Sequence, residues 1–336
     1  MDYRKKRIFV TGGTGFLGGH LITELAKRGA QITALGRRSP SNELQALGVR
    51  FIQGRLEDAR LMMESIKGHD LVAHIGAFSS PYGLYRDFYR SNVLGTQNIF
   101  NACLENNVER CVYISSPSIY FDTHNRENIT EDMPYAQKLL NSYVKTKMAS
   151  ELLADEFSAR GLDIITLRPR AIFGPGDTTI LPPIIEINAK GKFPRFNKGP
   201  VKADITYVDN VVDAILLAFQ GRKQLAGEKF NITNNEVHEL YAILEKLFQA
   251  LGHPHKTKKL PFTPLYLTVS LLENIYLALG IKNPPPITTT GLMYLAYGQS
   301  FDITKAKREL GYQPKISVEE GLTRYASWYQ EHFHKN

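Results

Sequence analysis

The first half of the chain alternates short apolar runs, rich in β-branched residues, with longer stretches of helical periodicity, and no other feature restricts the fold as strongly. The runs lie at residues 7–10, 31–35, 49–53, 70–75, 110–115 and 163–167. Because parallel strands need crossover helices that cover both faces of the sheet, the pattern predicts an α/β fold with a doubly wound, mostly parallel sheet. Ligands are then expected at the carboxyl ends of the strands.

The second half of the chain shows a different pattern. After about Pro169, irregular segments rich in proline and glycine mix with helical patterns at residues 214–220, 237–251, 264–279 and 318–332. We therefore predict a main unit at residues 1–168 and a smaller, mainly helical C-terminal part at residues 169–336. Elements at about residues 204–222, a short strand and the helix after it, are expected to return to the main unit.

Composition excludes several classes of protein. With 336 residues, 43% of them hydrophobic, the chain can bury a large core. Cys103 and Cys111 lack metal-binding spacing, and His253 and His255 lack a recognisable third ligand, so we expect neither a disulfide framework nor a metal site. The formal net charge is +8, but no nucleic-acid-binding signature accompanies it, so nucleic acid is not an expected partner. We expect no signal peptide and a cytoplasmic location.

A glycine-rich loop at residues 10–18 follows the first apolar run and opens the first helical stretch. Gly12, Gly15 and Gly18 allow a tight turn, a close approach of the backbone to a pyrophosphate, and close packing of helix on sheet. The N-terminus of the helix then offers N–H groups to the phosphates. Such glycines also form simple turns, but their position after the first strand predicts a dinucleotide-binding, Rossmann-type unit.

The end of the second predicted strand bears on the choice of dinucleotide. Enzymes that use NAD usually have an acidic residue here that binds the ribose hydroxyls, whereas this chain reads Leu35-Gly36-Arg37-Arg38. A guanidinium pairs well with a 2′-phosphate, so the sequence favours NADP(H) over NAD(H). The alternative is that both arginines are exposed loop charges.

Tyr143 and Lys147 form the single Tyr-x-x-x-Lys of the sequence, a spacing that puts both side chains on one face of a helix. An adjacent ammonium group and a positive nicotinamide ring would favour the phenolate, so Tyr143 could exchange a proton with a hydroxyl or carbonyl group at neutral pH. Ser116, near the end of the fifth strand, is the candidate that holds the substrate oxygen. The alternatives are a surface tyrosine and a serine that caps a strand.

Several segments together resemble the extended short-chain dehydrogenase/reductase superfamily, to which the NAD-dependent epimerase/dehydratase family belongs. The matching motifs occur in that family's order at residues 10–18, 74–77, 92–96, 112–116, 143–147 and 168–177. Residues 116–122, 206–210 and 300–312 are similar to the bacterial 3β-hydroxysteroid dehydrogenase-like branch, which includes reductases of 2-alkyl-3-oxoalkanoic acids. This resemblance covers the chain almost from end to end.

The resemblance implies roles for individual residues. The catalytic set would be Ser116, Tyr143 and Lys147, and Asn92 would be a helix asparagine, either structural or part of a proton relay. The expected cofactor-binding residues are Gly12, Thr14, Gly15, Phe16, Leu17, Gly18, Arg37, Arg38, Leu56, Ile75, Gly76, Ala77, Asn92, Ile114, Tyr143, Lys147, Pro169, Arg170 and Ile172. The expected substrate residues are Phe78, Ser79, Ser116, Ser118, Tyr143 and Phe173.

Some positions depart from the family's pattern. The chain has Gly54-Arg55-Leu56 where relatives often have Gly-Asp-Leu, which puts the expected acidic contact near the adenine in doubt, and Gly76-Ala77 replaces Ala-Ala. Dehydratases of this group usually have an acidic pair directly after the catalytic hydroxyl residue, where this chain has Pro117-Ser118. A dehydratase is therefore disfavoured.

We predict an NADP(H)-dependent oxidoreductase that transfers a hydride between the nicotinamide and a secondary alcohol or ketone of a small hydrophobic substrate, sterol-like or long-chain 3-oxoacyl. The alternatives are a nucleotide-sugar epimerase with tightly bound NAD, and a non-catalytic protein that senses NADP(H). A UDP-sugar that raises the melting temperature would favour the epimerase.

The apolar stretch at residues 264–279 is too short and too interrupted by polar residues to span a membrane. Lysines precede and follow it, so we expect a lid over an apolar pocket that also contacts a membrane surface peripherally. The alternative is an ordinary buried helix. A homodimer is the expected assembly.

Overall fold

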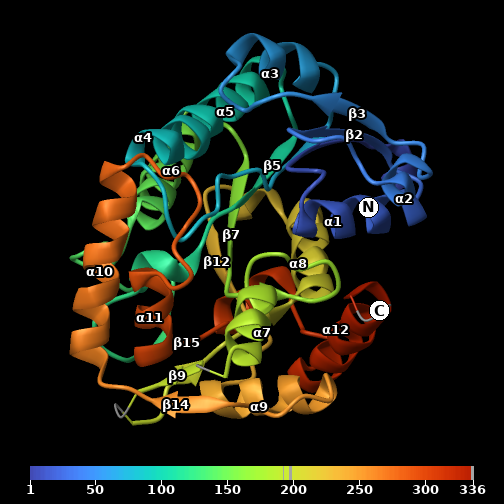
Figure 1. The fold of residues 1–336 in the computed structure, drawn as a ribbon. Coiled ribbons are helices and arrows are strands. Elements are labelled where there is room, and N and C mark those ends of the chain that lie inside the picture. The colour runs from blue at the N-terminus through green and yellow to red at the C-terminus, as the bar shows by residue number, and fades with distance from the viewer. Residues whose placement is uncertain (192, 197–198, 334–336) are drawn as a thin grey trace.

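The computed structural model describes residues 1–191, 193–196 and 199–333. Its main sheet contains only parallel strands, in the order β3-β2-β1-β4-β5-β7-β12. These strands are β1 (Arg7–Thr11), β2 (Gln31–Gly36), β3 (Arg50–Gln53), β4 (Leu71–His74), β5 (Arg110–Ile114), β7 (Ile164–Pro169) and β12 (Lys229–Ile232). The predicted doubly wound Rossmann-type fold is confirmed, with a strand order that reverses direction between β1 and β4. β5, β7 and β12 run through the middle of the molecule (Figure 1).

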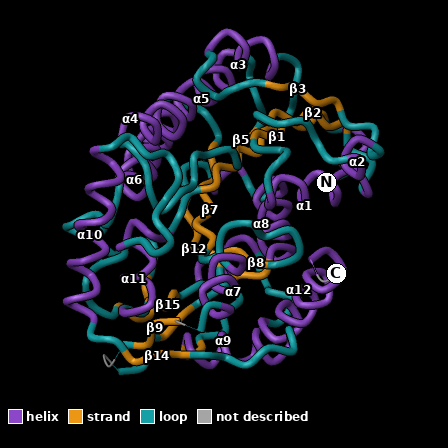
Figure 2. Tube along the Cα trace, viewed as in Figure 1, coloured by secondary structure: helices purple, strands orange, loops and turns teal. Residues whose placement is uncertain are grey.

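Helices cover both faces of this sheet (Figure 2). One face packs against α1 (Phe16–Lys27) and α8 (Val208–Gln220), and the other packs against α3 (Ala59–Ile66), α5 (Gly95–Glu105) and α6 (Ser142–Ala159). Side chains along β1 alternate between the two cores, since Ile8 and Val10 enter the first and Phe9 enters the second. Both faces are therefore buried, as a parallel sheet requires.

The remaining elements lie between and beyond these strands. The helices are α2 (Asn42–Gln45), α4 (Tyr85–Phe88), α7 (Leu181–Ala189), α9 (Leu240–Ala250), α10 (Phe262–Ala278), α11 (Thr289–Ala296) and α12 (Val318–Phe333). The strands are β6 (Arg126–Ile129), β8 (Ile172–Phe173), β9 (Phe193–Arg195), β10 (Lys202–Ala203), β11 (Thr206–Tyr207), β13 (His238–Glu239), β14 (Thr257–Lys259) and β15 (Gln299–Phe301). Short 3₁₀-helices span Tyr3–Lys5, Pro117–Tyr120 and Lys223–Leu225, and π-helices span Tyr89–Leu94 and Ala306–Leu310.

Several short strands connect the two halves of the chain in ways the sequence pattern does not show. β12 extends the main sheet beside β7, while β6 from the first half joins a second sheet in the order β13-β10-β15-β6. β11 pairs with β8 outside the main sheet, but α8, which follows it, packs on that sheet. The strand that the sequence places at residues 204–208 thus shrinks to two residues, and the helix after it returns to the main unit.

No helix in the part of the chain that the structure describes has the length and apolar character needed to cross a membrane. The longest apolar helix of the second half, α10, lies at the outside of the molecule beside α11 (Figure 1).

Candidate active site

The glycine loop joins β1 to α1 and turns so tightly that side chains do not fit. Gly12 has φ +69°, a conformation that favours glycine, and a Cβ there would lie 2.9 Å from the Cα of Gly76. A Cβ on Gly18 would lie 2.2 Å from the carbonyl oxygen of Gly12. A Cβ on Gly15, by contrast, would meet only this carbonyl oxygen, at 3.1 Å, so Gly15 borders open space.

This loop fits the phosphates of a dinucleotide. Gly15 precedes the first residue of α1, and within the described chain no side chain caps this helix N-terminus. The first N–H groups of α1 therefore remain available to an anion, and the helix dipole favours negative charge there. Thr14 and Phe16 flank Gly15, whereas Leu17 is buried in the core, so only its backbone can contact a cofactor.

The end of β2 has no room for an acidic side chain. A Cβ on Gly36 would lie 2.4 Å from the Oγ1 of Thr14, so the threonine side chain occupies the position where a carboxylate would stand. Arg37 and Arg38 follow directly and are both exposed. Within the described residues, neither guanidinium group forms an ion pair with a carboxylate.

The loop after β4 packs against the glycine loop. The hydroxyl of Thr11 accepts a hydrogen bond from the Gly76 N–H (2.9 Å) and lies 2.8 Å from the Nδ1 of His74. The other ring nitrogen of His74 lies 2.9 Å from the Oγ1 of Thr96. Burial and the charge of Lys147 lower the pKa of His74 to about 3, so this ring is neutral and connects three elements.

The next residues of this loop, and Leu56 after β3, complete the predicted cofactor side. Leu56 lies against Gly76 and Gly95, because a Cβ on either glycine would approach its side chain to within 3.3 and 2.6 Å respectively. Ile75 and Ala77 are half-buried in the same loop. The structure therefore brings the residues predicted from the first, third and fourth strands to one edge of the sheet, its carboxyl edge.

Asn92 lies in the π-helix before α5 and fixes the loop that carries Phe78. Its side chain accepts a hydrogen bond from the Phe78 N–H (2.7 Å) and donates to the Phe78 carbonyl (3.2 Å) and to the Oγ1 of Thr146 (3.0 Å). Its own carbonyl accepts a hydrogen bond from the Ser150 hydroxyl (2.7 Å). Of the two predicted roles, these contacts describe the structural one.

Tyr143 lies in the first turn of α6, which Asn141 caps by accepting a hydrogen bond from the Val144 N–H (2.9 Å). Burial raises the pKa of Tyr143 above its ordinary value, while the nearby hydroxyl groups of Ser116 and Ser79 act in the opposite direction. The phenol therefore lies beside the two serines that the sequence predicts for the substrate, and it remains protonated at neutral pH.

Lys147 corrects one part of the predicted chemistry. Its ammonium group donates a hydrogen bond to the carbonyl of Ile114 (2.7 Å) and lies 4.4 Å from the ring centroid of Tyr113. Burial lowers the pKa of Lys147 to about 7, and the charge of Glu151 acts in the opposite direction. In this state the cation lies against the end of β5, so burial rather than the ammonium group decides the pKa of Tyr143.

Ser116 combines the two interpretations considered for it. It caps the 3₁₀-helix Pro117–Tyr120, since its Oγ lies 3.3 Å from the Ser118 nitrogen and 2.8 Å from the Ser118 Oγ. It is also close enough to Tyr143 to affect the pKa of the phenol. Ser118 is buried behind it, so its hydroxyl orients Ser116.

The segment from Pro169 to Phe173 leaves the sheet at its carboxyl edge. Pro169 ends β7, and Arg170 and Ile172 are half-buried. Phe173 was predicted to contact the substrate, but the structure places it in the main core, 1% exposed, with its ring centroid 5.7 Å from that of Tyr207. The pairing of β8 with β11 turns Phe173 inward, so this prediction is wrong.

A buried ion pair lies behind these residues, and the sequence interpretation missed it. Arg168 donates to Glu151 from Nε (3.0 Å to Oε1) and Nη2 (2.6 Å to Oε2), and the two side chains are 1% and 0% exposed. Glu151 also accepts a hydrogen bond from Ser115, and Arg168 donates to the hydroxyl of Tyr120. The sequence feature that could have indicated Glu151 is its spacing, because it lies one helical turn after Lys147 and therefore on the same face of the helix.

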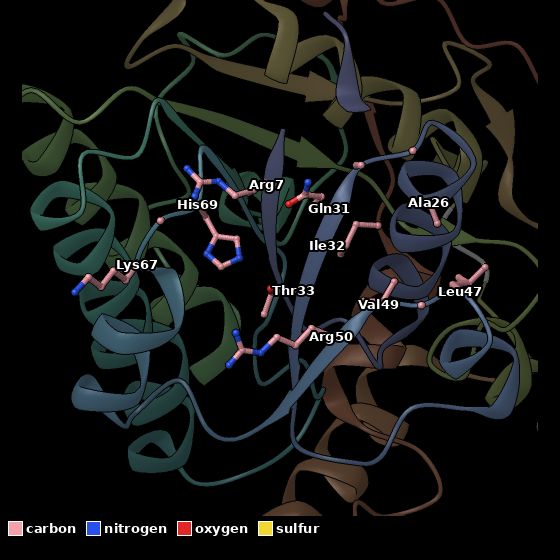
Figure 3. A pocket seen from close by; sticks show the side chains of 14 residues that line it. Arg7, Ala26, Gln31, Ile32, Thr33, Leu47, Val49, Arg50, Lys67 and His69 are labelled. Atoms are coloured by element: carbon pink, nitrogen blue, oxygen red, sulfur yellow. The ribbon is translucent and has the colours of Figure 1, made fainter. Parts of the chain in front are cut away.

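A surface pocket lies at the opposite edge of the sheet (Figure 3). Arg7 and Arg50, the first residues of β1 and β3, line it together with His69. Ligands of parallel sheets bind at the carboxyl ends of the strands, so this pocket is not part of the candidate active site.

The chain is similar to known proteins over almost its whole length. The chain is 34% identical over 323 residues to a 2-alkyl-3-oxoalkanoate reductase of Stenotrophomonas maltophilia, which covers 95% of this chain and 98% of the relative. It is 30% identical over 328 residues to a decarboxylating sterol-4-alpha-carboxylate 3-dehydrogenase of Homo sapiens, which covers 95% of this chain and 87% of the relative.

Solved structures show the same fold. MoeE5 in complex with UDP-glucose and NAD superposes with a TM-score of 0.77 at 24% identity, covering 97% of this chain and 99% of that one. The expected superfamily and an NAD(P)-dependent enzyme of the extended short-chain type are confirmed. The family model for the NAD dependent epimerase/dehydratase family matches residues 8–233, and the chain belongs to this family.

Proposed function

We propose that the protein transfers a hydride between NADP(H) and a secondary alcohol or ketone of a hydrophobic substrate. The observation that carries the proposal is the desolvated phenol of Tyr143, which lies beside the hydroxyls of Ser116 and Ser79 at the carboxyl edge of a dinucleotide-type sheet. A neutral phenol in this place can give its proton to a substrate oxygen.

When bound, the dinucleotide supplies or accepts the hydride at its nicotinamide ring. In the reducing direction, Ser116 donates a hydrogen bond to the carbonyl oxygen and Tyr143 transfers its phenolic proton to the same atom as negative charge develops there. The ketone is reduced to an alcohol, and the phenolate regains a proton from solvent. We assign Lys147 the role of stabilising the transient negative charge of the phenolate, for which its ammonium group must leave the Ile114 carbonyl to which it donates in this structure.

Aromatic rings next to the phenol support an apolar substrate. The ring centroid of Phe88 lies 6.5 Å from that of Tyr143 and 4.6 Å from that of Phe78. The similar proteins are named for oxoalkanoates and for sterol carboxylates, both of which are hydrophobic molecules with an oxygen on a secondary carbon.

The preference for NADP(H) rests on Gly36, Arg37 and Arg38. The Thr14 side chain fills the position of a carboxylate, and two exposed cations follow. We expect Arg37→Ala and Arg38→Ala each to lower kcat/KM for NADPH about tenfold to hundredfold, with little change for NADH. The matched control is Arg60→Ala, which removes an exposed arginine of α3 that pairs with Glu64. Equal values for NADPH and NADH in the unmodified protein would contradict the preference.

The activity is tested with purified protein, NADPH and a panel of hydrophobic ketones, and in reverse with secondary alcohols and NADP⁺. We expect cofactor oxidation or reduction that depends on substrate. Conversion of UDP-sugars without net cofactor turnover, in the absence of any ketone reduction, would instead establish an epimerase. Cofactor binding without turnover of either class would refute an enzyme.

A further inference from the structure

Arg170 is a half-buried cation at the candidate site that forms no ion pair within the described residues. Its buried Nε atom has no hydrogen-bond partner among them. The residue as a whole is half-buried, so a small ligand can reach the guanidinium group. A buried polar group without a partner is costly, and such groups often mark functional sites.

The position of Arg170 relative to the catalytic phenol follows from α11. Thr290 in α11 accepts a hydrogen bond from the side chain of Asn141 (2.9 Å), two residues before Tyr143. Tyr294 lies one helical turn after Thr290 and therefore on the same face. The guanidinium carbon of Arg170 lies 5.1 Å from the ring centroid of Tyr294. Tyr294 thus contacts the cation of Arg170 and is also near enough to Tyr143 to raise the pKa of its phenol.

The backbone around Arg170 is fixed. Its N–H donates to the carbonyl of Ile232 (3.0 Å), and its carbonyl accepts a hydrogen bond from the Thr206 hydroxyl. Ala171 follows with φ 42°, a left-handed conformation that is strained for a residue with a Cβ atom. Such strained conformations persist only where the surrounding structure fixes the backbone, and they cluster at active sites and ligand-binding sites.

One acidic residue, Asp204, lies near enough to interact electrostatically with Arg170. Its Oδ2 accepts a hydrogen bond from the Phe301 N–H (2.8 Å), and burial raises the pKa of Asp204 to about 6, although the charge of Arg170 acts in the opposite direction. Oδ2 is occupied by the backbone of β15, and Oδ1 forms no hydrogen bond with Arg170 within the described residues, so the guanidinium group can bind another anion.

We infer that Arg170 binds the carboxylate of a substrate that carries its ketone or hydroxyl group on the carbon next to the carboxyl-bearing carbon. This inference rests on the proposed function and names its substrate class. Both similar proteins reported above have names that describe this arrangement: a 3-oxoalkanoate, and a sterol 4-carboxylate oxidised at position 3. The oxygen would meet Tyr143 and Ser116, while the carboxylate meets Arg170 beside Tyr294.

The test compares a stable acid with its uncharged analogue. A long-chain 2-alkyl-3-hydroxyalkanoate and its methyl ester are oxidised with NADP⁺ by the unmodified protein, by Arg170→Met and by Arg170→Lys. A charge-assisted hydrogen bond that is lost on substitution lowers kcat/KM about tenfold to hundredfold. We expect this loss for the acid with Arg170→Met, a smaller loss with Arg170→Lys, and little change for the ester with either variant.

The matched control is Arg195→Met, since Arg195 also lies over a tyrosine ring, 5.0 Å from the centroid of Tyr241, but is exposed and belongs to β9. It should leave both substrates unaffected. Equal losses of kcat/KM for acid and ester in Arg170→Met would overturn the inference. An increased KM for NADP⁺ as the only effect of Arg170→Met would also overturn it, and would favour the cofactor-binding role that the sequence suggested for Arg170. A protein that oxidises neither compound would refute the proposed function itself.

A second, independent observation concerns the outer face of α10. Large apolar side chains at four-residue spacing form a stripe along this face and its C-terminal end, with 63%, 64%, 45% and 70% of their surface exposed: Leu267, Leu271, Ile275 and Leu279. Glu273, the single acidic residue of the helix, is turned away to the N–H (3.0 Å) and hydroxyl (2.6 Å) of Thr289 in α11. The stripe therefore has no charged residue of its own.

Exposed lysines lie at both ends of this stripe. Lys258 and Lys259 are in β14, before α10, and Lys282 follows the helix. None of the three forms an ion pair within the described chain. We propose that α10 docks on an anionic lipid surface, with the leucine stripe in the interfacial layer and the lysines at the headgroups. α10 packs on α11, which carries Tyr294, so the docked face adjoins the route to the candidate site.

Vesicle sedimentation tests this surface. We expect the full chain to pellet with phosphatidylglycerol vesicles, less with phosphatidylcholine vesicles, and less at high salt. Leu267→Glu combined with Leu271→Glu should reduce the bound fraction at least tenfold. Met63→Glu combined with Val237→Glu adds the same charge at exposed apolar side chains elsewhere and should leave binding nearly intact. Equal losses of vesicle binding in both double variants would overturn the proposal. Absence of vesicle binding by the unmodified protein would also overturn it, and a dimer that only the leucine variant dissociates would then show that a second copy of the chain covers the stripe.

Discussion

The substitution Arg168→Met isolates the buried ion pair that lies behind the candidate site. It removes the two strong hydrogen bonds to Glu151 (3.0 and 2.6 Å) and leaves a carboxylate that is 0% exposed, with Lys229 at 3.9 Å as its remaining cation. Breaking a buried pair in this way typically costs about 3–5 kcal/mol, because the remaining charge keeps its desolvation penalty. With a denaturant slope of about 3 kcal/mol/M in urea, the unfolding midpoint should fall by about 1–1.7 M.

The loss of stability caused by Arg168→Met should depend on pH, because folding shifts the pKa of Glu151 in opposite directions in the unmodified protein and in the variant. In the unmodified protein burial raises the pKa of Glu151, but the hydrogen bonds and charge of Arg168 outweigh burial and lower it. A lowered folded-state pKa contributes stability above the unfolded value of about 4.3, and this contribution is lost as pH falls. In Arg168→Met the Ser115 hydrogen bond and the Lys229 charge still favour the carboxylate, but the strongest opposition to burial is gone, so the pKa of Glu151 rises and its protonation lowers the loss of stability at low pH. The difference in stability should therefore be larger at pH 8 than at pH 5.

Urea unfolding followed by circular dichroism at both pH values measures these quantities. The double variant Glu151→Gln/Arg168→Met removes the stranded charge and should recover a large part of the loss at pH 8. Arg160→Met is the matched control, because Arg160 lies 3.7 Å from Glu156 in an exposed pair and its loss should cost about 0.5 kcal/mol or less. A midpoint for Arg168→Met that equals the control value, or that is independent of pH, would refute the reasoning.

Three further predictions concern the site itself. Tyr143→Phe should lower kcat at least about 10²-fold and leave the Kd for NADPH within about twofold, measured by fluorescence titration; a joint loss would contradict the role in proton transfer. Gly18→Ala should weaken NADPH binding and lower the melting temperature, because the new Cβ would lie 2.2 Å from the carbonyl oxygen of Gly12. The control Gly19→Ala should leave the melting temperature unchanged or raise it, because its Cβ would lie 3.8 Å from the nearest atom, in the side chain of Leu44. The pKa of Lys147 is lowered to about 7, so kcat/KM should fall as pH rises through this value and the ammonium group loses its proton. Lys147→Arg should remove this inflection from the plot of kcat/KM against pH. A plot that Lys147→Arg leaves unchanged would refute the role of Lys147.

The sheet was largely predictable because strand formation in the first half follows local patterns. The runs that form the inner strands β1, β4, β5 and β7 are buried on both faces of a parallel sheet and are therefore rich in apolar residues, whereas the edge strand β3 is only half-buried. β12 escaped prediction because only Phe230 and Ile232 mark its four residues, and its place is fixed by pairing with β7, which is distant in sequence. β11 and β8 have two residues each and owe their pairing to tertiary context.

The sequence predicts which residues of the candidate site lie near one another, but it predicts less well which contacts their side chains make. Glycine spacing reports backbone geometry, which is local, so the predicted tight turn between β1 and α1 is present in the structure. The direction of the Lys147 side chain depends on the Ile114 carbonyl, and that of Phe173 depends on Tyr207, both brought there by folding. Periodicity gives the face of a helix or strand, but it does not give the partner on that face.

The arrangement of hydrogen bonds around α6 separates the chemistry of the site from its specificity. Lys147 and Glu151 attach the helix to the sheet through Ile114 and Arg168, so the first half of the chain holds the helix after Tyr143. The second half of the chain reaches the same helix through its N-cap, where Asn141 donates to Thr290 of α11. Because this contact lies two residues before Tyr143 and six before Lys147, we expect changes in α11 to alter the surroundings of the phenol while Lys147 stays held at the Ile114 carbonyl.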